Sequence, residues 1–190
     1  MSHVLSWCSS LKAGKIGVAG FRKVKIERVE EILETAKRAF PSFTFQFFDA
    51  DRVAGRRHLE VAALYAEAAF KGGYAVSRSL AVEAALYASC QRQIGKALEM
   101  VGVKPETSKA VALCFGDNAE VFFSGIGKVL GWIRDDRVLE AWPRRLMELE
   151  KAYAVSRVEL KAAVEALGVE EDEAFLRLLW ERMGLLASQV

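Results

Sequence analysis

Basic side chains recur in successive segments between residues 56 and 96, and they are of the types that bind phosphate. Arginine forms bidentate contacts with phosphate oxygens, and the free N–H groups at the start of a helix attract the same anion. The short basic hinge Lys71–Ser79 ends at Ser79, and a helix is predicted to begin at this residue. The candidate phosphate-binding residues are Arg56, Arg57, Ser77, Arg78, Ser79, Arg92 and Lys96. On the residues alone they could form a local, pocket-like site for RNA, although scattered arginines and lysines on a small domain are more often solvated surface charges.

Two further side chains near the hinge could read a nucleobase. Tyr74 offers an aromatic face for stacking, and Gln93 offers an amide that can bond a base edge. Single-stranded RNA ends are recognised by both kinds of contact. Tyr74 could equally be a structural anchor packed on Phe70.

Nucleophilic catalysis would need a thiol or hydroxyl beside a base that is itself held in place. Cys114 lies in a predicted strand and Cys90 at a predicted helix end, so Cys90 is the more accessible thiol. His3 lies near the chain start, and His58 falls on an apolar helix, where a satisfied core residue is the commoner outcome. A small α/β enzyme that uses one of these cysteines therefore stays as an alternative.

Motifs for metals and nucleotides are weak. Asp49 and Asp51 end a predicted strand, where such a pair caps the next helix more often than it binds a cation. The segment 124–128 lacks the spacing and the Ser or Thr of a phosphate loop. No metal site and no cofactor is predicted.

The elements that must position these residues alternate between strands and helices. Strands are predicted at Ile16–Ala19, Phe43–Phe48 and Ala110–Phe115, and His3–Trp7 could add an edge strand. Helical periodicity follows each of the three main strands, and the last 70 residues are predicted to be helical. Ser156 opens one of these helices with a capping box, and Gly168 closes it. The predicted fold is α/β, with a small mixed sheet packed with helices and a helix-rich C-terminal part.

The helix predicted over 79–90 has a single charge, Glu83, so little of its surface suits water. It is either a central core helix or a helix that presents a second apolar face to a partner. The final helix also has more apolar surface than a surface helix needs. The residues assigned to a partner surface are Val82, Ala85 and Leu86 on the first helix and Met183 and Leu186 on the last.

Composition limits the class of protein. The chain has 190 residues with 52% apolar residues, which suits one domain over residues 1–190. Its apolar runs are too short to span a bilayer, and its start lacks the layout of a signal peptide, so we expect a cytoplasmic protein with no membrane partner. The three cysteines are far apart, which predicts reduced thiols. Residues 1–109 hold 17 basic and 11 acidic side chains, so the basic surplus lies in the part that carries the hinge.

Several short runs, taken in their order and spacing, resemble one known family. They are Phe48–Asp51, Ala54–Arg56 with His58-Leu59, Ser77–Leu80 with Glu83, Arg92–Ile94 with Ala97-Leu98 and Gly102, and Glu181–Met183. The chain is similar to the small kinase-regulatory subunit of the KEOPS tRNA-modification complex, of archaeal type, a family called PRPK-binding protein or CGI-121-like.

The resemblance implies a subunit with no catalytic activity of its own. Such subunits bind the small atypical kinase-ATPase of the complex, and archaeal examples capture the single-stranded 3' CCA end of tRNA. The complex installs threonylcarbamoyladenosine beside the anticodon, so the threonylcarbamoyl transferase subunit is an indirect partner. We therefore expect an accessory RNA-binding and kinase-regulating subunit, with the kinase on the five apolar residues named above. The alternatives are the cysteine enzyme and a scaffold that holds the kinase without contacting RNA.

Overall fold

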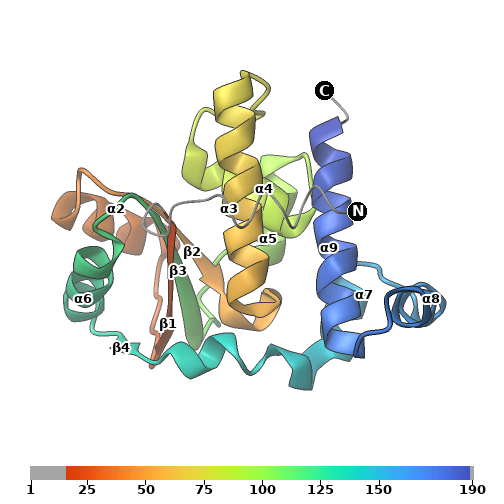
Figure 1. The fold of residues 1–190 in the computed structure, drawn as a ribbon. Coiled ribbons are helices and arrows are strands. Elements are labelled where there is room, and N and C mark those ends of the chain that lie inside the picture. The colour runs from red at the N-terminus through yellow and green to blue at the C-terminus, as the bar shows by residue number, and fades with distance from the viewer. Residues whose placement is uncertain (1–15, 189–190) are drawn as a thin grey trace.

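A computed structural model describes residues 16–188, and its centre is one four-stranded sheet in the order β2-β3-β1-β4 (Figure 1). The strands are β1 (Ile16–Arg22), β2 (Thr44–Asp49), β3 (Lys109–Phe115) and β4 (Ile133–Arg134). The three predicted main strands are confirmed within a few residues, and β4 was not predicted because it has only two residues. The possible strand at His3–Trp7 lies outside the described residues.

Within residues 16–188 all three strand pairings are antiparallel, so for this part of the chain the expectation of a mixed sheet is wrong. Helix α2 (Val29–Ala39) returns the chain from β1 to β2 in the parallel direction, but β3 lies between these two strands. Helix α6 (Ala119–Leu130) connects β3 to β4 around β1 in the same way. These are two split βαβ units, and each separates the strands that run parallel. The α/β class and the helix-rich C-terminal part are confirmed.

The two faces of the sheet pack into different cores because successive residues of a strand point to opposite sides. In β1, Val18 belongs to the core beneath α3 (Gly55–Gly72), whereas Ala19 belongs to the core beneath α2 and α6. Figure 1 shows α2 and α6 on one side of the sheet and α3 on the other. The second core is aromatic, and the Phe45 and Phe122 rings stack there with centroids 4.8 Å apart.

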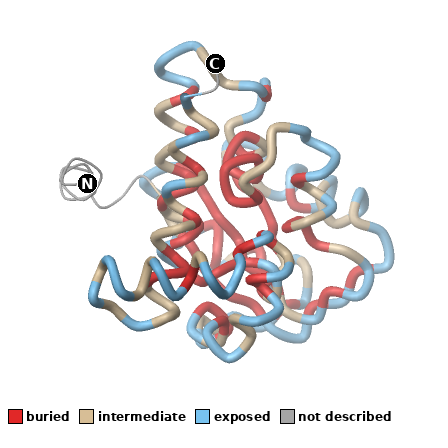
Figure 2. Tube along the Cα trace, turned by 90° about the vertical axis from the view of Figure 1, so that its right-hand side faces the viewer, coloured by how far each residue is buried: buried red, intermediate tan, exposed pale blue. Residues whose placement is uncertain are grey.

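A helical insertion between β2 and β3 carries most of the candidate site. It consists of α3, α4 (Leu80–Ser89) and α5 (Ile94–Val101), preceded by the short 3-10 helix η1 (Ala50–Arg52). Helix α4 packs against both α3 and α5. Of its ten residues only Leu80 and Val82 are not buried, so α4 is a central core helix. Figure 2 shows that buried residues concentrate in the interior and exposed residues at the periphery.

The C-terminal part wraps around α3. Two 3-10 helices, η2 (Asp136–Leu139) and η3 (Trp142–Arg145), lead into α7 (Leu146–Ala152), α8 (Arg157–Leu167) and α9 (Glu171–Ser188). The capping box at the start of α8 and its end at Gly168 are confirmed. Helix α9 packs along α3 and α8 and also contacts α4, which places α9 beside the insertion (Figure 1).

Candidate functional site

The hinge turns sharply after α3. Gly73 ends the helix in the left-handed region, with φ 73°, and the Tyr74 N–H donates to the Ala69 carbonyl oxygen at 3.0 Å. The Tyr74 ring lies over Gly72, where a Cβ atom would come within 2.3 Å of it. The turn therefore depends on two consecutive glycines, and it holds Tyr74 half-buried against the core.

A buried carboxylate holds the middle of the hinge. Glu83 is 2% exposed, and its carboxylate accepts the N–H of Ser77 at 2.7 Å and the N–H of Val76 at 3.3 Å. Ser77 is also buried, and its hydroxyl oxygen accepts the Ser79 N–H at 3.0 Å. Ser79 caps α4 as predicted, with its hydroxyl oxygen accepting the Val82 N–H at 3.5 Å. Ser77 therefore supports the hinge from inside, while Ser79 is exposed.

Three of the predicted basic residues, Arg78, Arg92 and Lys96, form no ion pair among residues 16–188. Arg78 and Lys96 are exposed. Arg92 is half-buried and donates from Nη1 to the Leu186 carbonyl oxygen at 3.0 Å. Gln93 is exposed at the start of α5. Arg78, Lys96 and Gln93 are therefore accessible to solvent, whereas Arg92 already has a backbone partner.

A small pocket beside the hinge brings several of the predicted residues together. Its lining consists of Tyr74, Val76, Glu83, Leu86, Tyr87, Gln91, Arg92 and Leu186. Burial, the main cause, and the nearby Tyr74 and Glu83 raise the pKa of the Tyr87 hydroxyl to about 12, so Tyr87 is a neutral hydrogen-bonding group here. The pocket lining therefore combines an arginine, a carboxylate, two tyrosines and an amide with three aliphatic side chains.

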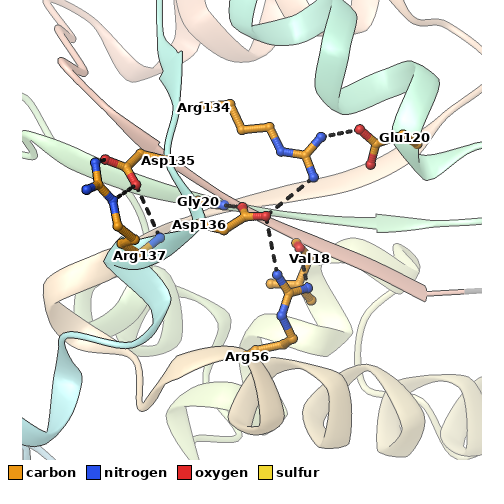
Figure 3. A network of polar contacts seen from close by, with 8 residues as sticks. All are labelled: Val18, Gly20, Arg56, Glu120, Arg134, Asp135, Asp136 and Arg137. Atoms are coloured by element: carbon orange, nitrogen blue, oxygen red, sulfur yellow. Dashed lines mark hydrogen bonds and ion pairs between the residues drawn. The ribbon is translucent and has the colours of Figure 1, made fainter.

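Arg56 and Arg57 do not belong to this group, contrary to the predicted constellation. They lie at the opposite end of α3 from the hinge, roughly 24 Å away at 1.5 Å per residue. Figure 3 shows Arg56 beside Asp136, with an ion pair of 3.6 Å, and Arg56 also donates to the Val18 carbonyl oxygen. Arg57 pairs with Glu173 at 2.6 Å. Both arginines are engaged in joining α3 to its neighbours.

The network around Asp136 joins η2 to the sheet edge. Asp136 accepts the Gly20 N–H at 2.8 Å and pairs with Arg134 at 3.4 Å, while Asp135 pairs with Arg137 at 2.7 Å (Figure 3). A Cβ atom at Gly20 would lie 2.7 Å from the Asp135 carbonyl oxygen. The close approach of η2 to β1 therefore needs glycine, and this region has a structural function.

The residues predicted for a partner surface divide into two groups. Ala85, Leu86 and Met183 are buried within the chain, with Leu86 only 3% exposed. Their burial reflects the packing of α4 between α3, α5 and α9, which the apolar pattern alone did not separate from a partner surface. Val82 and Leu186 are partly accessible, and Leu186 lines the pocket with Val76, which is 46% exposed.

The described thiols are poorly suited to nucleophilic catalysis. Burial raises the pKa of both Cys90 and Cys114 to about 12, so the reactive thiolate is scarce at neutral pH. His58 is completely buried, its Nδ1 accepts the Ala54 N–H at 3.0 Å, and burial lowers its pKa to about 4. This confirms the interpretation of His58 as a core residue. The possible base His3 lies outside the described residues.

The paired aspartates have structural partners. Asp49 accepts the Asp51 N–H at 2.8 Å and the Thr107 hydroxyl at 2.7 Å, and Asp51 pairs with Lys109 and Arg145. The capping interpretation is confirmed. In the part of the chain that the structure describes, no group of three or more His, Cys, Asp or Glu side chains could hold a metal ion. No described helix is both long and apolar enough to cross a membrane.

Sequence reasoning missed the function of Glu83. A lone acidic residue one turn into an otherwise apolar helix is the available signal, because such a charge must find hydrogen-bond donors when it is buried. Periodicity alone identifies Glu83 as the one charged residue of its helix, without the hinge N–H groups that its carboxylate binds.

Residues 21–167 match the family model described as kinase binding protein CGI-121, which is more than half of the chain. The chain belongs to the CGI-121 family. The CGI-121 match includes the hinge, α4 and α5, and it ends at Leu167, the last residue of α8, so α9 with Met183 and Leu186 lies beyond it. No curated protein matches the chain. Membership in a family of kinase binding proteins supports an accessory, kinase-binding role.

Proposed function

We propose that this protein is a non-catalytic subunit of the KEOPS complex, which makes threonylcarbamoyladenosine in tRNA. In this proposal it binds the atypical kinase-ATPase subunit and captures the single-stranded 3' CCA end of tRNA. The observation that carries the proposal is the match to the kinase binding protein family, because the matched residues include the hinge and every residue that lines its pocket except Leu186. The protein would act in the cytoplasm.

The surface for RNA consists of the accessible residues of the hinge region. Arg78 and Lys96 are exposed cations without an acidic partner among residues 16–188, so they are available to phosphates. Arg92 and Tyr74 line the adjacent pocket, and Gln93 is exposed close to Arg92 in the chain. Arg56 and Arg57 are left out of the proposed contact because both are engaged in ion pairs at the other end of α3. Cations beside an aromatic ring suit a splayed single strand.

The proposed kinase surface is centred on Val82 and Leu186, and Leu186 lines the same pocket as the buried Leu86. Val76, which is 46% exposed, extends this apolar area toward the hinge. The kinase and the RNA would therefore bind on neighbouring surfaces. Holding the acceptor end beside the kinase would keep the rest of the same tRNA at high effective concentration near the transferase subunit.

Two measurements test the two halves of this proposal. Size-exclusion chromatography with the kinase subunit of the same organism should show a complex that the Val82→Glu substitution disrupts. An electrophoretic shift should show binding to tRNA that is lost when the terminal CCA is removed. A complex with kinase but no binding of intact tRNA would favour the pure scaffold, whereas an iodoacetamide-sensitive turnover of a small substrate would favour the cysteine enzyme.

A further inference from the structure

The Glu83 side chain connects the first turn of α4 to the hinge before it. No backbone hydrogen bond of a helix or strand would join these two parts of the chain. The Glu83 carboxylate accepts N–H groups from Ser77 and Val76, six and seven residues earlier, at 2.7 and 3.3 Å. The side chain comes from the first turn of α4 and bonds back onto the hinge that leads into that helix. The hinge backbone is thereby held by the helix that follows it.

Two serines extend this bonding to the start of the helix. The Ser77 hydroxyl oxygen accepts the Ser79 N–H at 3.0 Å, and the Ser79 carbonyl oxygen accepts the Glu83 N–H at 2.8 Å. Ser77 and Ser79 are both held, and Arg78 lies between them with its side chain exposed. The direction in which Arg78 leaves the backbone therefore depends on the bonds that begin at Glu83.

The burial of Glu83 is tied to the hinge. A buried carboxylate is unfavourable unless hydrogen bonds compensate it, and the N–H groups of Val76 and Ser77 supply them, while an apolar residue would leave both donors without this acceptor. The neighbours of Glu83 in the pocket are Tyr74, Tyr87 and Arg92, and the N-terminal end of the α4 dipole also favours a negative charge. A buried acid with two backbone donors is well placed to fix one conformation of a segment.

We propose that Glu83 is a positioning residue for RNA capture, which holds the hinge so that Arg78 and the start of α4 present one fixed phosphate-binding geometry. This inference rests on the proposed function. Glu83 does not contact the RNA itself. It acts through Arg78. Without the hydrogen bonds of Glu83, the hinge that carries Arg78 would adopt many conformations.

The test compares Glu83→Gln with Glu99→Gln, which removes the same charge from an exposed position on α5. Glutamine keeps the size of the side chain but replaces one acceptor oxygen by an NH2 group, which faces an N–H donor. Amide hydrogen exchange by NMR on the full chain should be about tenfold faster at Val76 and Ser77 in Glu83→Gln and unchanged in Glu99→Gln, since a bond to a charged acceptor is lost. Binding of intact tRNA should weaken by a similar factor in Glu83→Gln alone.

A double-mutant cycle with Arg78→Gln separates positioning from general destabilisation. Glu83→Gln should weaken tRNA binding in the wild-type background and have no further effect in the Arg78→Gln background. Equal losses in both backgrounds, or unchanged exchange at Val76 and Ser77, would overturn the role of Glu83.

A second variant covers the case in which Glu83→Gln does not fold. Ser77→Ala removes the acceptor of the Ser79 N–H with a small change in volume, and it should give the same coupling to Arg78. Additive effects of Ser77→Ala and Arg78→Gln would contradict the role. A wild-type chain that binds no tRNA would contradict the proposed function itself. The exchange rates at Val76 and Ser77 test separately whether Glu83 holds the hinge, and they do not depend on that result.

Discussion

Arg92 donates a hydrogen bond of 3.0 Å to the backbone carbonyl oxygen of Leu186, 94 residues further along the chain. This bond joins the segment between α4 and α5 to the end of α9, and both residues line the pocket beside the hinge. The proposed RNA surface and the proposed kinase surface therefore meet at one bonded pair. Arg92 consequently contributes to folding as well as to the site, and this separates it from Arg78 and Lys96.

Charge reversal at Arg78 and Lys96 should weaken tRNA binding without lowering stability, because both side chains are exposed and have no acidic partner among the described residues. The log–log salt dependence of binding should become shallower by about 0.7 for each phosphate contact that is lost. Filter binding at several salt concentrations measures both effects.

The matched control for this pair is the double reversal Lys37→Glu with Arg38→Glu, on the exposed surface of α2 across the sheet. It changes the net charge equally, so it should reproduce only the non-specific part of the loss. A control that weakens binding as much as Arg78→Glu with Lys96→Glu would show that overall charge, and not the hinge, determines affinity.

Arg92→Gln, in contrast, should also lower the free energy of unfolding by about 1 kcal/mol, since it removes the bond to Leu186.

Substitutions on α4 should separate the core from the kinase surface. Leu86→Glu is expected to destabilise the isolated chain by several kcal/mol, because Leu86 is 3% exposed and an unpaired carboxylate would be buried. Val82→Glu should leave the urea midpoint nearly unchanged and weaken kinase binding, since Val82 is partly accessible. Val158→Glu, at a position 79% exposed on α8, serves as the control. Kinase binding that survives Val82→Glu and Leu186→Glu together would place the partner elsewhere.

Tyr74 is predicted to stack on a base from its position over Gly72. Tyr74→Phe should keep most of the tRNA affinity, because the ring face is retained. Tyr74→Ala should lose on the order of 1–3 kcal/mol of binding free energy. Thermal melting of both variants is the necessary companion measurement. A Tyr74→Ala protein that melts earlier but binds tRNA as tightly as the wild type would show that the ring is only an anchor of the hinge.

The buried His58 should make stability depend on pH. Burial lowers its pKa to about 4 from 6.5, so the unfolded chain binds the proton more strongly than the folded chain at intermediate pH. The contribution of the neutral, buried His58 side chain to folding stability is complete above pH 6.5. It decreases as the pH falls from 6.5 toward 4, because the unfolded chain then takes up the proton. The free energy of unfolding should decrease by about 2 kcal/mol between pH 7 and pH 5 through this residue. Urea titrations of the wild type and His58→Gln should show a shallower pH dependence in the variant, and equal slopes would contradict the assignment.

Local sequence signals predicted the elements well where the physics is local. The aromatic run Phe43–Phe48, the capping box of Ser156 and the cap at Ser79 all depend on residues a few positions apart. These patterns allowed three of the four described strands and the main helices to be located before the structure was known.

The parts that were missed depend on contacts between distant residues. Asp136 bonds the N–H of Gly20 across 116 positions, and this contact determines where η2 and Arg56 lie. Arg56 and Arg78 belong to successive segments of the sequence and were therefore predicted to lie together. Arg56 lies at the start of the 18-residue helix α3, and Arg78 follows the end of that helix. The apolar pattern of α4 was likewise compatible with a core helix and with a partner surface, and only the packing of α3, α5 and α9 around it distinguishes the two.

The most direct test of the central claim is the affinity of the full-length chain for one tRNA species with and without its terminal CCA. Equilibrium filter binding at constant salt should show that removal of the three nucleotides weakens binding by at least about tenfold, because stacking and phosphate contacts to the single-stranded end are lost. Equal affinity for the intact and the trimmed tRNA would contradict the account.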